Sequence, residues 1–220
     1  PKSTNFGLGI TILKHNYDET DFKGALQIAF EHDNTVLIEK FIPGREFRIF
    51  IINDEVVGIL HRVPANVTGD GVLNIGQLID RKNEDPLRGK GYRTPLEKIR
   101  KGREEEMFLK QQGMDFNTVP KEGEVVYLRE NSNISTGGDS IDFTDDIDDS
   151  YKAIAVEAAK ALNVKITGLD MMIQDIHAPA TPDNYAIIEM NFNPAIHIHC
   201  YPFKGKNRHL NHKTIRALGF

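Results

Sequence analysis

The sequence predicts an α+β protein, in which helices accompany mixed or antiparallel sheets. Two observations support this prediction. Apolar runs at 47–52 and 55–63 are joined by Asn53-Asp54, a dipeptide typical of a hairpin turn. Helical and strand-like patterns then alternate irregularly along the chain, unlike the regular β-α-β order of dinucleotide-binding folds.

Residues 1–63 are expected to form a small subdomain. A strand is predicted at 9–14, and a helix follows it with Asp18 or Thr20 as its N-cap. A second strand is predicted at 35–41, and a Pro-Gly turn separates it from the hairpin.

Residues 64–123 change character, because Pro, Gly and charged residues become dense. Short helices are expected at 75–81, 95–101 and 104–112. We interpret this segment as a charged insertion or lid on the main body, of the kind that often carries function.

Residues 124–220 are expected to form a large subdomain. The predicted elements are a strand at 125–129, a polar loop at 130–149, an amphipathic helix at 150–162, strands at 165–174 and 185–192, and a closing helix at 209–218. Met171-Met172 reads as core filling.

Composition limits the possible functions. The 220 residues are 40% hydrophobic, enough for one sizeable core or two joined subdomains. The net charge of −5 disfavours nucleic-acid binding, and the basic stretch 88–103 is interleaved with Glu97, as in a charged surface lobe. The single Cys200 excludes an internal disulfide.

No apolar run approaches the ~20 residues of a membrane span, so we expect a soluble cytoplasmic protein. Because a loop motif follows Pro1 directly, we also expect a fragment of something longer.

The strongest candidate site is a trio of oxygen-bearing side chains on two neighbouring strands. Glu189 and Asn191 are two positions apart, so both face the same side of the sheet, and Asp170 joins them if the strands pair. Such hard donors amid apolar residues suit Mg²⁺ beside phosphates. The alternative is a strand end with solvated carboxylates.

A second candidate runs from Glu39 to Glu46, where an apolar strand ends in a turn. Lys40, Phe41 and Ile42 offer an apolar slot and extended backbone for an adenine, while Glu46 suits ribose hydroxyls. An ordinary charged strand end explains the pattern about equally well.

The opening loop offers Lys2 and Ser3 to a phosphate, although a plain turn is the simpler interpretation. Arg62 and Arg129 each end an apolar run and suit phosphate or carboxylate; surface salt bridges are the alternative.

His197 and His199 are two positions apart on an expected strand, so they could bind a transition metal. A structural role, or a place in the wall of the substrate site, explains them better. Cys200 would face the other side of that strand, and no role is assigned to it.

Taken together, these segments resemble the ATP-grasp superfamily. The runs 61–71, 127–142 and 191–201 are similar, more narrowly, to the C-terminal domain of bacterial bifunctional glutamate–cysteine ligases/glutathione synthetases, and more loosely to cyanophycin synthetase. The resemblance covers nearly the whole chain. The family's lysine before the Gly-rich loop is missing, because Pro1 comes first, and so is the preceding subdomain.

The resemblance implies that two subdomains hold ATP between them. The carboxylate of γ-glutamylcysteine would take the γ-phosphoryl group, and the amine of glycine would attack the acyl phosphate to give glutathione and ADP. It implies these roles: Asp170, Glu189 and Asn191 hold Mg²⁺ or Mn²⁺; Arg62, Arg129 and Asn133 are catalytic; Lys2, Ser3, Glu39, Lys40, Phe41, Ile42 and Glu46 bind the nucleotide.

The same resemblance implies an N-terminal ligase domain in the parent chain and allows a homodimer. Two alternatives stay open. One is another ATP-grasp amino-acid ligase, of the cyanophycin or D-alanine type. The other is a nucleotide-binding fragment without turnover.

Overall fold

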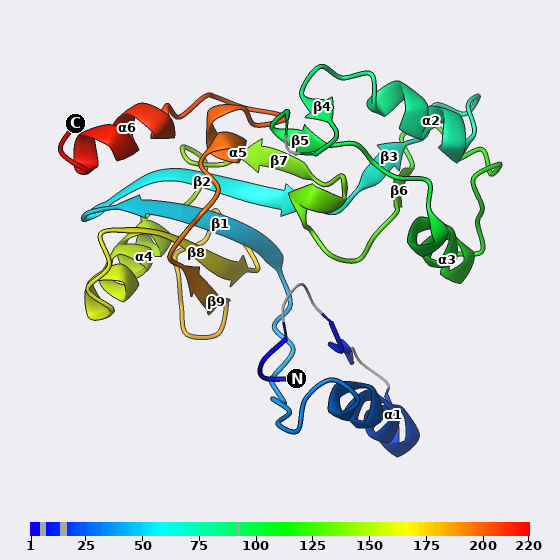
Figure 1. Cartoon of the computed structure of the whole chain (residues 1–220), viewed down its shortest axis with the longest axis horizontal. Coiled ribbons are helices and arrows are strands. Elements are labelled where there is room, and N and C mark those ends of the chain that lie inside the picture. Colours follow the sequence, from blue (N-terminus) through cyan, green and yellow to red (C-terminus); the bar gives the residue numbers. More distant parts are fainter. Residues whose placement is uncertain (5–7, 14–16, 92) are drawn as a thin grey trace. The chain divides into compact units, whose positions relative to one another are not determined.

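The computed structural model describes residues 1–4, 8–13, 17–91 and 93–220 (Figure 1). The chain divides into two compact units, Pro1–Pro43 and Gly44–Phe220, which are described separately. The hairpin strands that sequence analysis assigned to the first subdomain belong to the second unit. None of the described helices is long and apolar enough to cross a membrane.

The first unit contains helix α1 (Glu19–Phe30), whose N-cap is Asp18. The Asp18 side chain accepts hydrogen bonds from the backbone N–H groups of Thr20 and Asp21, which decides between the two predicted caps. The strands predicted at 9–14 and 35–41 are wrong for the described residues, and Lys14 lies outside them. The apolar patterns are present, but the described part of this unit contains no strand with which they pair.

A five-stranded antiparallel sheet organises the second unit, in the order β7-β2-β1-β8-β9. Its strands are β1 (Arg45–Ile52), β2 (Glu55–Val63), β7 (Asp139–Asp142), β8 (Ile166–Ile173) and β9 (Tyr185–Asn191). The predicted hairpin is confirmed as β1–β2, and the two late strands are confirmed as β8 and β9. β7 was missed, because it lies inside the segment predicted as a polar loop.

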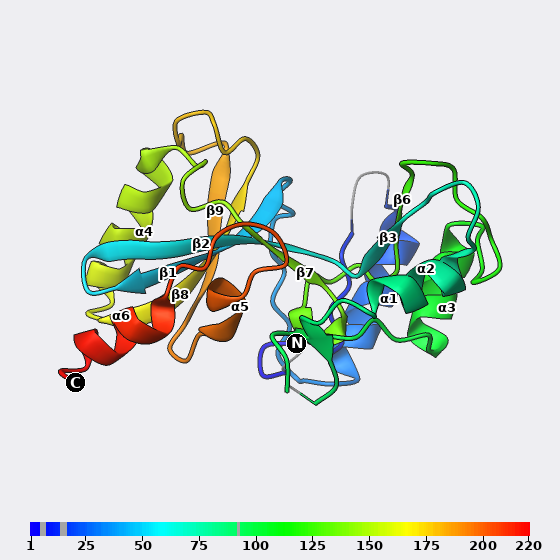
Figure 2. The ribbon, with the colours of Figure 1, turned by 90° about the horizontal axis from the view of Figure 1, so that it is seen from above.

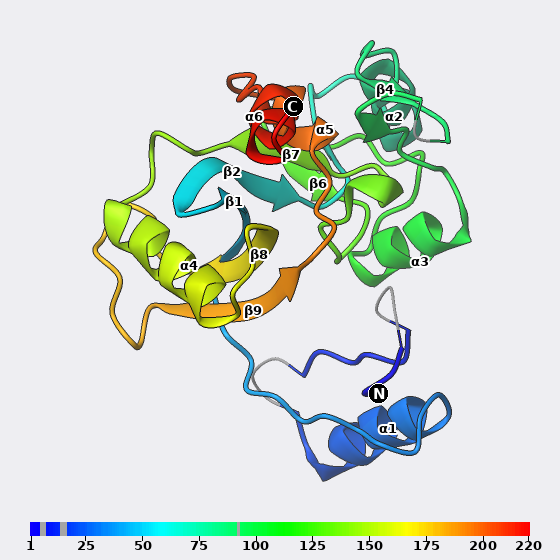
Figure 3. The same cartoon turned by 60° about the vertical axis from the view of Figure 1, so that its left-hand side comes forward.

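The two faces of this sheet have different covers (Figure 3). Helix α4 (Asp149–Ala161) packs on one face, which we call the α4 face, through Tyr151, Ala155 and Ala159. The short helix α5 (His197–Cys200) and helix α6 (Leu210–Ala217) lie on the other, the α5 face. The expected strand geometry at His197–Cys200 is therefore wrong, because these residues form one helical turn.

Residues 64–128 form a lobe with its own core, seen to one side of the sheet in Figure 2. Its elements are β3 (Asn66–Thr68), α2 (Ile75–Lys82), β4 (Arg88–Gly89), β5 (Leu96–Glu97), α3 (Arg103–Gln111) and β6 (Val125–Tyr127). Two predicted helices are confirmed as α2 and α3. The helix predicted at 95–101 is wrong: Pro95 favours an extended residue before it, and β5 pairs with β4 instead.

A buried ionic cluster fastens the lobe to β7. Asp139 pairs with Arg88 and with Lys82, whose Nζ lies 2.6 Å from Oδ2 of Asp139. Asn66 donates to the same oxygen at 3.0 Å. The ring of Phe203, from the segment before α6, lies 5.2 Å from Nζ of Lys82. The lobe therefore binds to β7 through the Asp139 carboxylate, and the segment before α6 packs against the same cations, which fixes the lobe beside the sheet.

A second ionic contact holds the segment that leads to α6. Arg208 donates to Asp142 of β7, with Nε 2.9 Å from Oδ2, and to Asp145, with Nη1 2.9 Å from Oδ1. Burial favours the neutral acid at Asp142, but the hydrogen bonds from Arg208 and Thr144 outweigh it and lower the pKa of Asp142.

Candidate active site

A row of charged side chains crosses the sheet on its α5 face. Arg48 of β1 lies directly opposite Asp170 of β8, which in turn lies opposite Glu189 of β9. Residues directly opposite one another in antiparallel strands project to the same face. Phe50, two positions from Arg48, packs in the cluster with Cys200 and so identifies this face. Asp170, Glu189 and Asn191 thus share a face, as the sequence predicted.

Asp170 is the centre of this row. It is only 3% exposed. Arg48 forms a fork with it, through Nε to Oδ1 and through Nη2 to Oδ2 at 2.8 Å. Nη2 of Arg62 lies 3.0 Å from the same Oδ2. A buried carboxylate between two guanidinium groups is held in one orientation, and its hydrogen bonds are shared between them.

Glycine at position 168 allows this arrangement. A Cβ on Gly168 would lie 2.9 Å from Cδ of Arg48 and 2.8 Å from Cβ of Pro194. The Arg48 side chain therefore lies close over the backbone of β8, which is how it reaches Asp170. Pro194 belongs to the run 191–201, one of the three on which the family resemblance rests.

Glu46 joins the row from the start of β1. Its carboxylate pairs with Arg62 and accepts a hydrogen bond from Oγ of Ser132 at 2.7 Å. Nδ1 of His61 lies 2.9 Å from the Glu46 carbonyl oxygen. Burial and the nearby Arg45 guanidinium lower the pKa of His61 to about 4, so the neutral ring donates this bond. The structure thus places Glu46 in an ionic network; its ribose role stays a prediction.

Glu189 and Asn191 form the open end of the row. Glu189 is exposed, and Nδ2 of Asn191 donates to its Oε1 at 2.9 Å. This bond leaves the second oxygen of Glu189 and the amide oxygen of Asn191 without a hydrogen-bond partner among the described residues. Asp170 already accepts three hydrogen bonds, so one of its roughly four lone-pair sites stays open.

These donors fit a hard divalent cation at the edge of the sheet, with Glu189 as the most accessible ligand. Within the described ranges, no point gathers three or more His, Cys, Asp or Glu side chains. An amide oxygen or ligand oxygens are therefore needed to complete such a site.

The other predicted catalytic residues lie elsewhere in the second unit. Arg129 pairs with Glu104 and Glu105 of α3, and its Nε lies 2.6 Å from Oε1 of Glu105. Asn133 precedes a short 3-10 turn, and its carbonyl accepts from Thr136. Neither side chain bonds to the charged row in the described structure, so their catalytic roles stay predictions.

The predicted nucleotide residues of the first unit lie in irregular chain. The backbone N–H of Ser3 donates to Oδ2 of Asp33 at 2.7 Å, and that of Lys2 to the carbonyl of Thr35 at 2.9 Å. Backbone N–H groups of Thr35 and Ser3 lower the pKa of Asp33. Glu39, Lys40 and Phe41 are exposed and Ile42 is half-buried. Glu46 belongs to the second unit, so the predicted hinge spans the junction.

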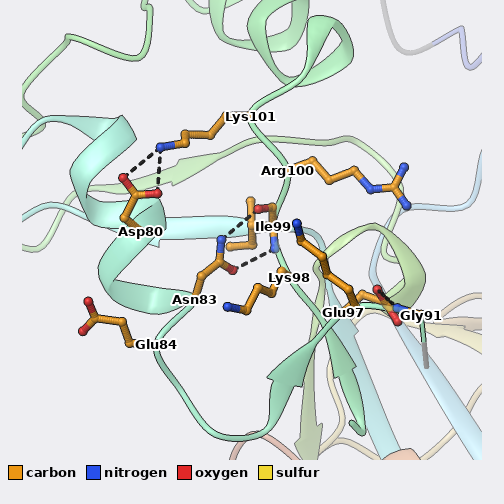
Figure 4. A pocket seen from close by; sticks show the side chains of 10 residues that line it. Asp80, Asn83, Glu84, Gly91, Glu97, Lys98, Ile99, Arg100 and Lys101 are labelled. Carbon is orange, nitrogen blue, oxygen red and sulfur yellow. Dashed lines mark hydrogen bonds and ion pairs between the residues drawn. The ribbon is translucent and has the colours of Figure 1, made fainter. Parts of the chain in front are cut away.

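A surface pocket of about 650 Å³ opens in the lobe, away from the charged row (Figure 4). Asn83 and Ile99 bond reciprocally at its wall, at 2.8 Å and 2.9 Å, and Lys101 pairs with Asp80. None of its lining residues belongs to the row. The row is the better candidate because of its chemistry.

Sequence reasoning missed Arg48 and Ser132. Arg48 interrupts the apolar run from Phe47 to Ile52. It lies two positions from Glu46, and this spacing could have indicated that the two charged side chains share one face of the strand. Its partner Asp170 lies 122 positions away.

Comparisons with known proteins show what this chain is similar to. No family model matches the chain. The glutathione biosynthesis bifunctional protein GshAB of Desulfotalea psychrophila is 64% identical over 220 residues, which are 100% of this chain and 28% of that protein. GshAB of Clostridium perfringens is 58% identical over 218 residues, or 99% of this chain and 28% of that protein.

A solved structure extends the likeness to the fold. The crystal structure of a bifunctional glutathione synthetase from Pasteurella multocida matches 99% of this chain with 30% of its own, at a TM-score of 0.79 and 47% identity. The chain thus spans less than a third of the length of these relatives. Along its whole length the chain is therefore similar to one segment of the bifunctional glutathione biosynthesis proteins, and it shares the fold of the solved bifunctional glutathione synthetase, in agreement with the fold that the sequence predicted.

Proposed function

We propose that this chain is the catalytic segment of an ATP-dependent ligase that joins γ-glutamylcysteine to glycine through an acyl phosphate. The observation that supports the proposal is the charged row, in which two arginines and three oxygen-donor residues share one face of the sheet. The names of the relatives point to glutathione as the product, because those proteins are called glutathione biosynthesis bifunctional proteins. The two substrates are those that the family resemblance implies.

The reaction brings a carboxylate to a triphosphate, so negative charges must be neutralised where they meet. Arg62 is the best placed residue for this task. It bridges Asp170 and Glu46 and is partly exposed, so an arriving phosphate or carboxylate can compete for its guanidinium. Arg48 is buried, and its hydrogen bonds hold the Asp170 carboxylate in place.

Glu189, Asn191 and the open lone pair of Asp170 would hold Mg²⁺. When bound, such an ion neutralises phosphate charge and orients the transferred group. Manganese prefers the same oxygen donors, so we propose Mg²⁺ or Mn²⁺ as alternatives.

The remaining predicted residues would act around this row. Lys2 and Ser3 would bind phosphates, and Glu39 to Ile42 would hold the adenine, with Glu46 on the ribose. Arg129 would have to leave Glu105 before it reached a phosphate.

We propose the division into 1–63, 64–123 and 124–220, with ATP between subdomains, as the working domain scheme. An N-terminal ligase domain in the parent chain and a homodimer are part of the same proposal.

The test is ATP turnover by this sequence extended to the full length of its relatives. ADP release should depend on γ-glutamylcysteine, glycine and Mg²⁺ together, and mass spectrometry should detect glutathione. The Arg62→Met variant should lose at least about a thousandfold in kcat/KM, because the charge it neutralises is met in the transition state. Turnover with another acceptor, and none with glycine, would point to a different amino-acid ligase.

The second candidate is a nucleotide-binding segment without turnover. Calorimetry with ATP and Mg²⁺ separates it from the first. Binding without ADP release in the extended protein would support the second candidate and contradict the first.

A further inference from the structure

Glu105 places a charge on the buried face of helix α3. It is only 1% exposed, and Leu109, one turn further along the helix, belongs to the apolar core of the lobe. An ionised carboxylate in such a position costs stability unless its oxygens are paired. An apolar side chain would serve simple packing better, so the carboxylate calls for another explanation.

Both oxygens of Glu105 are engaged, each by a different part of the chain. Oε2 accepts a hydrogen bond from the backbone N–H of Gly102, the N-cap of α3, at 2.9 Å. A Cβ at position 102 would lie 3.1 Å from this oxygen, so glycine leaves room for the side chain to fold back. Oε1 accepts from Nε of Arg129 at 2.6 Å, and Glu104 pairs with the same guanidinium. The carboxylate thus joins the start of α3 to the chain that follows β6.

Arg129 begins a short strap, residues 129–132, which leads to the charged row. At the end of the strap, Oγ of Ser132 donates to Oε2 of Glu46 at 2.7 Å, and the other oxygen of Glu46 pairs with Arg62. Three residues of chain span at most about 11 Å even when fully extended. A shift of Arg129 therefore leaves little slack at Ser132.

We propose that Glu105 is a positioning residue, which holds Arg129 so that the strap keeps Ser132 on Glu46 and Glu46 on Arg62. The geometry of the row thereby depends on helix α3 of the lobe. The strap gives Arg129 a task that needs no contact with a phosphate. Because Arg62 meets the incoming anionic groups in the proposed ligase, the readout by turnover rests on that proposed function.

The first experiment measures turnover in the full-length protein. Glu105→Gln keeps an acceptor for the N–H of Gly102 but loses the charge that holds Arg129. We expect kcat per folded molecule to fall about tenfold with the KM for ATP unchanged, because Arg62 is misplaced but still present. Glu106→Gln, exposed and next along α3, is the matched control and should keep the full rate. Equal losses in both variants, or no loss in Glu105→Gln, would overturn the proposal.

A double variant tests whether the effect runs through the strap. Ser132→Ala alone should also lower kcat about tenfold, because Glu46 loses the hydroxyl that holds it. The combination of Glu105→Gln with Ser132→Ala should be about as slow as the slower single variant, since both changes break one chain of contacts. A merely structural role of Glu105 predicts that the two losses multiply to about a hundredfold. That result would reject the strap.

The third experiment needs no turnover. In the Ser132→Cys variant the thiol lies beside the Glu46 carboxylate, which raises the pKa of the thiol and slows its reaction with an aromatic disulfide reagent. Adding Glu105→Gln should speed the labelling of residue 132, read by peptide mass spectrometry, at least about fivefold, and adding Glu106→Gln should not. Unchanged labelling sinks the proposal, whatever the activity. Faster labelling in a protein without ligase turnover would support the strap and reject only the proposed function.

Discussion

The two faces of the central sheet are built from alternate residues of the same strands, yet they do different work. On the α4 face, Phe47, Ile49 and Met171 are fully buried against a helix. On the α5 face, the residues between them include Arg48 and Asp170, which are nearly as buried but charged. The first face supplies stability through apolar burial, and the second carries charges that only pairing makes tolerable.

Four predictions test this contrast. The largest effect is expected from Asp170→Asn. The amide cannot neutralise Arg48, so about 3–5 kcal/mol of stability should be lost. Ligase turnover should fall at least about a thousandfold, because the row loses its central charge. Denaturant unfolding and ADP release measure the two effects. The control is Met171→Leu, one residue away on the other face; a similar loss of turnover there would contradict the contrast.

Next in size is Ile49→Ala, beside Arg48 but on the α4 face. A cavity in a fully buried cluster should cost about 2–5 kcal/mol in the free energy of unfolding. The rate per folded molecule should change less than about twofold, since no charge in the row is touched. Urea unfolding and the specific rate, corrected for the folded fraction, check this. A specific rate reduced as strongly as in Asp170→Asn would show that the two faces are not separable.

A smaller effect is expected from Glu189→Gln, at the exposed end of the row. Stability should stay within about 0.5 kcal/mol, because an exposed side chain is altered. The Mg²⁺ concentration for half-maximal turnover should rise about tenfold, since a charged oxygen donor is lost. Glu157→Gln, an exposed acid on α4, is the matched control. An unchanged Mg²⁺ requirement in Glu189→Gln would remove this residue from the proposed ligand set.

The smallest effect concerns pH. The folded pKa of His61 is about 4, below its usual 6.5, so the unfolded chain takes up the proton first as the pH falls. The contribution of His61 to stability is therefore complete above about pH 6.5 and is lost as the pH falls towards about 4. His61→Gln should flatten the decline of stability with falling pH in this window, measured by urea unfolding. His212→Gln, on the surface, should not; equal flattening in both would contradict the assignment.

The parts of the fold that were predictable have strong local periodicity. The hairpin, α4 and β8 each bury one face or an apolar run that the sequence displays, and β9 shows an apolar run although none of its residues is fully buried. The failures lack such a signal or depend on partners. Leu96 is buried in a two-residue strand beside β4, and β7 is recruited from a polar loop by pairing with β2. The His197–Cys200 segment alternates like a strand but turns into a helix below the sheet.

The site divides in the same way. That Glu189 and Asn191 share a face follows from spacing alone, and Asp170 joins them once the strands pair. The contact between Arg48 and Asp170 depends on the register of β1 against β8, which no local pattern encodes. The pairing of Arg129 with α3 depends likewise on how the lobe folds back on itself.

The sharing of Arg62 between Asp170 and Glu46 has a consequence for selectivity. An isolated chloride ion meets a guanidinium that is already paired with two carboxylates, and it brings too little charge to displace either of them. A ligand that arrives with several anionic groups and its own metal ion compensates that displacement at more than one point. The pairing of Arg62 with two carboxylates therefore favours ligands that bring several charges over single monovalent ions.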